Sequence, residues 1–298
     1  MHSNDKLHDK RVTRAMRERL EPAIYRARHP LTVTAFTPKA PVTDAPISFD
    51  EAVRQPFTSL TTGSEWGSAW GTTWLHLTGE VPADWADLPG TAIEVVVDLG
   101  FTAAIPGFQA EGLVYSADGT VLKGVQSRNR WVPVTGAAGA PIDLYVEAAA
   151  NPDLVHDFGF APTELGDPGT LAGRPLYRLG RVDVALRDLE VWSLVQDIRA
   201  LHGLQAELPV TSTRRAQLRA GLERCLDRLD PDDVGGTAAE ARAELAPLLD
   251  RPATASAHHV HAVGHAHIDS AWLWPLRETP RKVARTLGNV LALVEERS

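Results

Sequence analysis

The sequence predicts a mixed, multi-domain protein whose parts follow one another along the chain. Two observations carry this prediction. The chain has 298 residues, more than one hydrophobic core usually spans, and its hydropathy pattern changes between helix-like and strand-like spacing. The parts expected, in order, are an N-terminal helix at 1–29, a β-sandwich domain at 30–195, a helical linker region at 196–256 and the first βα unit of an α/β barrel at 257–298.

The N-terminal segment has the spacing of an amphipathic helix. Val12, Met16, Leu20 and Ile24 recur every four residues, with charged residues between them. Pro30 is expected to end this helix, because proline lacks the backbone donor that a helix needs. We interpret the apolar stripe as a face that docks against the rest of the protein.

The region 30–195 carries short apolar runs separated by proline and glycine, which is typical of a β-sandwich. The Asp118-Gly119 pair between two of these runs predicts a hairpin turn. The tryptophans here are expected to fill a core rather than bind sugar, because Trp is a large apolar side chain. The runs are 72–81, 92–100, 112–124, 131–134 and 141–150, and the tryptophans are Trp66, Trp70, Trp74, Trp85 and Trp131.

The region 196–256 returns to helical spacing. Leu218, Leu222, Cys225, Leu226 and Leu229 share one helical face. Cys225 is therefore expected to be a buried apolar residue and not a reactive thiol.

The last segment reads as a strand followed by a helix. HHVHAVGHAHID at 258–269 predicts a buried strand that ends in polar residues. Thr279 and Pro280 then suit the start of a helix, whose apolar face is formed by Val283, Leu287, Val290, Leu291 and Val294. One βα unit cannot bury its own faces, so we expect the chain to be the N-terminal fragment of a larger domain.

Composition excludes several classes of protein. Asp and Glu number 38 against 30 Lys and Arg, a formal charge of −8, so neither a nucleic-acid footprint nor a polybasic membrane anchor is expected. A single cysteine excludes an internal disulfide framework. We find no secretory signal and no membrane-length apolar run, which makes the cytoplasm the expected location. The Arg281-Lys282 pair is expected on a solvated helix face.

The chemistry is concentrated in His265-Ala266-His267-Ile268-Asp269. On an extended strand, His265, His267 and Asp269 point to the same side. Imidazole and carboxylate suit zinc, but a catalytic zinc needs about three protein ligands, so further ligands must come from elsewhere. Trp272 and Trp274 follow, and aromatic faces beside a polar site suit sugar rings. The alternatives are another metal hydrolase with an H-x-H-x-D strand, or a set of hydrogen-bonded core histidines.

The segment AVGHAHIDSAWLWPLRET at 262–279 resembles the start of the catalytic domain in glycoside hydrolase family 38, the α-mannosidases. Within that family it is most similar to the cytosolic and vacuolar type, which also occurs in bacteria. WGTTWLHLTGEVP (70–82), PGFQAEGLVYSADG (106–119), NRWVPV (129–134) and DLYVEAAANP (143–152) are similar to the N-terminal β-domain of the same type, less specifically.

The resemblance implies a zinc-dependent, retaining exo-α-mannosidase that acts on α-linked mannosides and has a (β/α)₇ catalytic barrel. It places zinc ligands at His267 and Asp269, with another divalent metal as an option, and a sugar-stacking aromatic at Trp272. It gives His265 no role as a zinc ligand. Arg277 and Glu278 are expected either to pair with each other or to reach substrate.

The family's nucleophilic Asp and its remaining zinc-binding His are expected beyond position 298. No catalytic residue is therefore expected in this chain, which should be inactive alone. The alternative function is a non-catalytic β-sandwich that binds carbohydrate or makes oligomer contacts. The N-terminal helix and the β-domain are candidate contact surfaces for a homo-oligomer.

Overall fold

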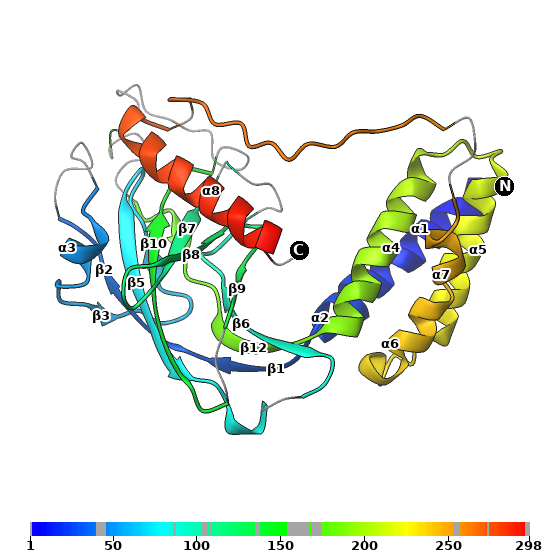
Figure 1. Cartoon of the computed structure of the whole chain (residues 1–298), viewed down its shortest axis with the longest axis horizontal. Coiled ribbons are helices and arrows are strands. Elements are labelled where there is room, and N and C mark those ends of the chain that lie inside the picture. The colour runs from blue at the N-terminus through cyan, green and yellow to red at the C-terminus, as the bar shows by residue number, and fades with distance from the viewer. Residues whose placement is uncertain are drawn as a thin grey trace. The chain divides into compact units, whose positions relative to one another are not determined.

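The structure is a computed structural model. It describes residues 2–39, 46–85, 88–102, 107, 109–134, 138–153, 167, 174–252, 257–272 and 274–295. The chain forms two compact units, each made from separate stretches of sequence (Figure 1). The helical unit comprises Met1–Arg28, Asp87–Ile93 and Ala185–Ala262, and the sandwich unit comprises His29–Ala86, Glu94–Val184 and Val263–Ser298.

The helical unit has its own hydrophobic core. Val12, Met16 and Leu20 are buried in it together with Leu222 and Cys225, so the predicted docking stripe of the first helix is confirmed. The helices are α1 (His2–Ala15), the π-helical turn Met16–Leu20, α2 (Glu21–Ala23), α4 (Leu189–Glu207), α5 (Thr213–Arg228), α6 (Val234–Ala243) and α7 (Ala246–Leu249). Burial raises the pKa of the Cys225 thiol to about 12, which agrees with the predicted inert cysteine.

Two predicted boundaries differ from the structure. The first helix ends at Ala23 and not at Pro30, because residues Tyr25–Pro30 form strand β1, which pairs with strand β12 (Val182–Asp188). Helix α4 begins at Leu189, so the predicted division at 195/196 falls inside it. Asp188 starts α4 because its carboxylate accepts the backbone N–H groups of Glu190 and Val191, at 3.0 and 2.9 Å.

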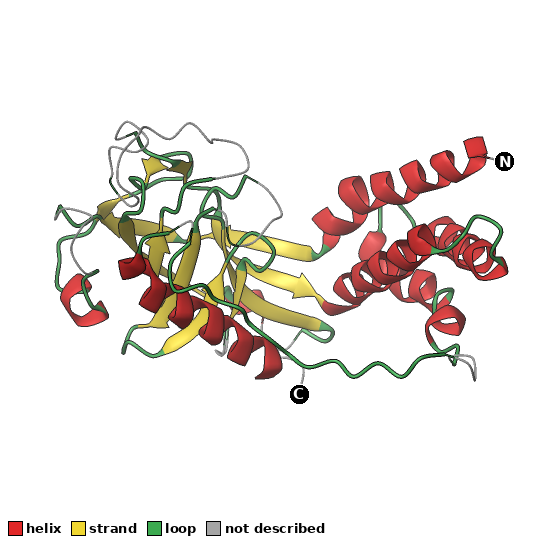
Figure 2. Ribbon diagram, turned by 90° about the horizontal axis from the view of Figure 1, so that it is seen from above, coloured by secondary structure: helices red, strands yellow, loops and turns green. Residues whose placement is uncertain are grey.

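The sandwich unit is built from two main sheets and a short ribbon (Figure 2). The four-stranded sheet has the order β1-β12-β6-β9, with β6 at Thr91–Val97 and β9 at Trp131–Pro133. The six-stranded sheet has the order β3-β2-β5-β10-β7-β8, with β3 at Thr58–Ser59, β2 at Thr32–Phe36, β5 at Thr72–Glu80, β10 at Pro141–Ala149, β7 at Glu111–Ser116 and β8 at Val121–Val125. The ribbon pairs β11 (Tyr177–Arg178) with β4 (Glu65–Trp66). Two short helices complete this part, α3 (Phe49–Ala52) and the 3₁₀ turn Ala83–Trp85.

The predicted strands and hairpin are present. Strands β7 and β8 pair antiparallel around Asp118-Gly119, where Gly119 has φ of 86° and its N–H donates to Ser116 at 3.0 Å. Both main sheets contribute buried apolar side chains, such as Val95 from β6 and Val146 from β10, as a sandwich core requires.

Four of the five tryptophans in the sandwich region lie in the core. Trp66, Trp70, Trp74 and Trp85 are all buried, which confirms the packing interpretation and leaves their faces unavailable to a sugar. Trp70 also has a φ of 61°, a left-handed conformation that costs a bulky residue about 1–3 kcal/mol.

The predicted C-terminal helix is confirmed as α8 (Thr279–Glu295), which follows the 3₁₀ turn Leu276–Glu278 and lies on strands β7 and β8 (Figure 1). Its predicted apolar face is not the one that contacts the sheet. Leu287, Val290, Leu291 and Val294 are exposed, whereas Arg285 on another face is buried. The physical reason is that the basic face of α8 forms ion pairs with glutamates on the strands of the sandwich.

A membrane-spanning helix needs about 20 consecutive apolar residues, and no helix within the described residues offers such a stretch.

Candidate active site

The segment that carries the H-x-H-x-D motif is extended but is not a strand. Residues 257–269 have no regular secondary structure, and Val260 and Val263 are 84% and 86% exposed. The predicted buried strand at 258–269 is therefore wrong in this structure, and of the predicted βα unit the helix alone is found. A strand requires a neighbouring backbone to pair with, and this segment pairs with no strand among the described residues.

The two predicted zinc ligands nevertheless lie together. The ring Nε2 of His267 is 3.2 Å from Oδ1 of Asp269; the His267 side chain is largely exposed, and that of Asp269 is half-buried. His265 is also near, with its ring stacked at a centroid distance of 6.4 Å from that of His267. Ile268, between His267 and Asp269, packs instead against the apolar group of Ala69, Trp70 and Trp274, as the predicted alternation requires.

The His267–Asp269 pair fits one part of a zinc site. Two ligands of a tetrahedral zinc, each about 2.0–2.1 Å from the ion, lie about 3.3 Å apart, close to the 3.2 Å between these atoms. A third ligand is missing from the part of the chain that the structure describes, where no group of three or more His, Cys, Asp or Glu side chains could hold a metal. These residues can supply two donors of a centre that needs at least one more.

The two tryptophans of the motif have different environments. Trp272 is 51% exposed, whereas Trp274 is buried and packs against Ala69 and Trp70. Their rings meet edge to face at 6.0 Å. Trp272 is therefore accessible to solvent beside the pair, whereas Trp274 serves packing.

A cavity of about 320 Å³ lies where these residues meet the sandwich. His267, Asp269 and Trp272 line one side, and Glu111 and Gln126 of the β7–β8 hairpin line another. The contribution of the hairpin is not predicted by the sequence pattern, because nothing local relates residues 111 and 126 to residue 269.

The charged residues that follow the motif contact the sandwich, and one expectation about them is wrong. Arg281 and Lys282 do not lie on a solvated face, since they are largely buried and form ion pairs with Glu147 and Glu111 of the sandwich. Glu278 is buried and pairs with Arg281 and Arg285, and its charge also acts on Arg277, so the expected interaction of Arg277 with Glu278 is present as an electrostatic one.

Comparison with known proteins gives two family matches. Residues 29–185 match the family described as "Alpha-mannosidase, jelly roll domain", and residues 257–298 match "Glycosyl hydrolases family 38 N-terminal domain". The chain belongs to the family 38 α-mannosidases. Its sandwich is thus the jelly-roll domain of these α-mannosidases, and the segment with His267 and Asp269 falls in the family 38 N-terminal domain. The match does not extend to a (β/α)₇ barrel, which the described residues do not show.

Individual α-mannosidases resemble the chain over most of its length. Alpha-mannosidase 2C1 of Mus musculus is 26% identical over 256 residues, and that of Homo sapiens is 27% identical over 255 residues; each alignment covers 84% of this chain. An alpha-mannosidase of Saccharomyces cerevisiae is 25% identical over 55% of this chain and 17% of its own length. The chain spans about 23% of the length of the mouse and human proteins.

Among solved structures, a β-glucuronidase of Ruminococcus gnavus aligns with 55% of this chain and 29% of its own, at 14% identity and a TM-score of 0.31. This score is too low to bear on fold or function.

Proposed function

We propose that this chain is the N-terminal part of a zinc-dependent, retaining exo-α-mannosidase that hydrolyses α-linked mannosides. The observation that carries the proposal is the pairing of His267 with Asp269 beside the exposed face of Trp272, in a segment that matches the family 38 N-terminal domain. Trp272 would stack on the apolar face of the mannose ring, and Nε2 of His267 and Oδ1 of Asp269 would hold the metal. A bound zinc ion, or another divalent metal, would supply a positive centre that orients the sugar hydroxyls.

We further propose that the chain is inactive alone, because the described residues that line the cavity offer no carboxylate free to act in catalysis. Retaining hydrolysis needs a nucleophilic carboxylate and an acid/base carboxylate about 5–5.5 Å apart. Two carboxylates line the cavity in the described residues, those of Glu111 and Asp269. Asp269 is the proposed metal ligand, and Glu111 is already paired with Lys282 and Arg285. Neither carboxylate is free to act as nucleophile.

The alternative function, a sugar-binding sandwich, finds less support. Its natural binding platforms, Trp66, Trp70, Trp74 and Trp85, are buried. On the charge of −8, we propose a protein without a nucleic-acid partner, and we propose the cytoplasm as its location on the apolar pattern of the sequence. Oligomeric contacts through the sandwich or the first helix remain a proposal of the same kind.

The experiment measures release of 4-nitrophenol from 4-nitrophenyl α-mannoside with and without added zinc. The 298-residue chain is expected to show none above background, and zinc-dependent release would refute its inactivity. A longer protein that joins this chain to the rest of a family 38 catalytic domain is expected to be active. His267→Ala and Asp269→Ala should then abolish turnover and weaken zinc binding, while His265→Ala serves as the matched control and should retain zinc. If the longer protein binds zinc and does not cleave α-mannosides, the proposed activity is wrong.

A further inference from the structure

Helix α8 follows directly on the segment with the candidate site and is attached to the jelly roll by buried charges. Glu278 and Arg285 are 2% and 3% exposed, and the side chains of Arg281 and Lys282 are 11% and 14% exposed. Charged side chains are rarely buried to this degree without partners. The three cations pair with carboxylates on strands β7 and β10, and Glu278 pairs with two of these cations.

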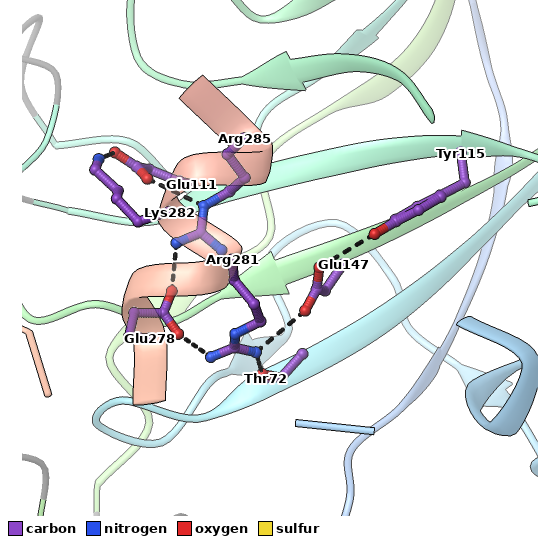
Figure 3. A network of polar contacts seen from close by, with 8 residues as sticks. All are labelled: Thr72, Glu111, Tyr115, Glu147, Glu278, Arg281, Lys282 and Arg285. Carbon is purple, nitrogen blue, oxygen red and sulfur yellow. Dashed lines mark hydrogen bonds and ion pairs between the residues drawn. The ribbon is translucent and has the colours of Figure 1, made fainter. Parts of the chain in front are cut away.

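Six side chains form this contact, which we call the α8 ion cluster: Glu111, Glu147, Glu278, Arg281, Lys282 and Arg285 (Figure 3). Glu111 on β7 receives Nε of Arg285 at 3.1 Å and also pairs with Lys282. Glu147 on β10 receives Nη1 of Arg281 at 3.2 Å and the hydroxyl of Tyr115 at 3.4 Å. Glu278 pairs with both arginines and so ties the start of α8 to its second turn.

The cluster is balanced in charge, with three carboxylates facing three cations. Burial by itself would raise the pKa of the Glu278 carboxyl, but the guanidinium groups of Arg285 and Arg281 overcome this and hold its pKa below the ordinary value. Removing one member of such a cluster leaves an uncompensated buried charge, whereas removing an opposite pair does not. An experiment can therefore compare a variant that unbalances the charge of the cluster with one that restores the balance.

A second, apolar contact holds the segment that precedes α8. Trp274 packs against Ala69 and Trp70 of the jelly roll, and Ile268 packs against the same group. Trp70 has its left-handed backbone conformation there, and its backbone N–H donates to the carbonyl of Ala150 at 3.0 Å. Lys282 connects the two contacts, because its Nζ lies 5.5 Å from the centroid of the Trp274 ring while it pairs with Glu111.

The close approach of α8 to strand β8 shows that this is a built interface. A Cβ at Gly124 would lie 2.5 Å from the carbonyl oxygen of Arg285, and a Cβ at Gly288 would lie 3.2 Å from Cγ1 of Val121. Glycines on both sides thus let helix and strand meet at a distance that larger residues would forbid.

We propose that the jelly-roll domain positions the candidate active site through these two contacts. Glu111, Glu147 and Trp70 act as positioning residues: they hold the stretch 268–285, and that stretch fixes where Asp269 and Trp272 stand. This inference rests on the proposed function, because that function identifies the site that is positioned. The attachment of α8 to the jelly roll can be tested whether or not the proposed function is correct.

The first experiment measures amide hydrogen exchange of α8 in the 298-residue chain. Glu111→Gln leaves the cluster with one excess positive charge, and exchange at 276–295 should become at least about tenfold faster. The double variant Glu111→Gln/Lys282→Gln restores charge balance and should recover most of the protection. Glu65→Gln is the control, since it removes an exposed ion pair with Arg178 in the same unit and should leave α8 unchanged. Unchanged exchange in Glu111→Gln, or no recovery in the double variant, overturns the inference.

The second experiment measures kcat and KM of the longer protein with 4-nitrophenyl α-mannoside, and its zinc affinity. Glu111→Gln is expected to lower kcat/KM by about tenfold to a hundredfold, mainly through kcat, and the double variant to recover it. If α8 loosens in Glu111→Gln while kcat/KM and zinc affinity stay at wild-type values, the jelly roll does not position the site. If the unaltered longer protein binds zinc but shows no turnover, the proposed function fails, and the zinc affinity of Glu111→Gln alone then decides the positioning role.

Discussion

Gly124 in strand β8 lies directly under helix α8, and a single methyl group there is expected to displace the helix. An ideal Cβ at this position would lie 2.5 Å from the carbonyl oxygen of Arg285 and 3.1 Å from Cβ of Asn289. Ordinary contact begins at 3.4 Å, so α8 and β8 must separate by about 0.9 Å. Because the nearest atom belongs to the helix backbone, no side-chain rotation can relieve the clash.

The separation has an energetic cost and a structural one. Overpacking of this kind destabilises proteins by about 1–3 kcal/mol. A movement of about 0.9 Å would also stretch the 3.1 Å contact between Arg285 and Glu111 beyond hydrogen-bonding range. Gly124→Ala should therefore weaken the α8 ion cluster as well as the packing.

The assay is urea unfolding of the sandwich unit, followed by tryptophan fluorescence, together with hydrogen exchange of α8. Gly264→Ala is the matched control, because a Cβ there meets nothing within 4 Å. Gly124→Ala should lower the free energy of unfolding by about 1–3 kcal/mol and speed exchange in α8, and the control should do neither. If Gly124→Ala matches wild type in both measurements, α8 is not seated on β8 as described.

Three other predictions concern the same chain. Trp274→Ala should lower the free energy of unfolding by about 3–5 kcal/mol, and Trp272→Ala by much less, since Trp272 is half exposed; equal losses in urea unfolding would contradict the division of roles between them. The pKa of Glu278 is lowered from 4.5 in the folded state, so its stabilising charge is fully present above the ordinary pKa and is lost as the pH falls through the lowered value. Exchange in α8 should thus be slow from neutral pH to about pH 4.5 and accelerate below it, after correction for intrinsic rates; acceleration on raising the pH instead would refute this sign. Gly203→Ala should stabilise helix α4 by about 0.5–1 kcal/mol, because its Cβ would meet open space, and a lower thermal midpoint would argue against it.

Local sequence pattern predicts a segment correctly where its structure depends on the spacing of its own residues. The four-residue spacing of Val12, Met16 and Leu20 predicts a buried helix face, and these residues are in the core of the helical unit. The Asp118-Gly119 pair predicts a hairpin, and strands β7 and β8 meet there. In the same way, the alternation of His267, Ile268 and Asp269 predicts which side chains share a side, and it survives although the predicted strand does not form.

Features that depend on contacts between residues far apart in the chain could not be predicted from local pattern. A strand is stabilised by a partner backbone, so the histidine-rich segment 258–269 could not become one without a neighbour. Trp272 and Trp274 are equivalent in sequence, and contact with Ala69 and Trp70 makes one of them core and leaves the other exposed.

Short-range patterns along the chain are enough to predict the family and the strand-rich sandwich, and they also suggest the residues proposed for the metal site. Whether the charged side chains of α8 are buried or exposed depends on the tertiary structure. Arg281 and Lys282 have the pattern of a solvated helix face, yet Glu147 and Glu111, which lie more than a hundred residues earlier in the chain, compensate their charge. Burial of a charge is favourable only when an opposite charge meets it, and that meeting is set by the fold.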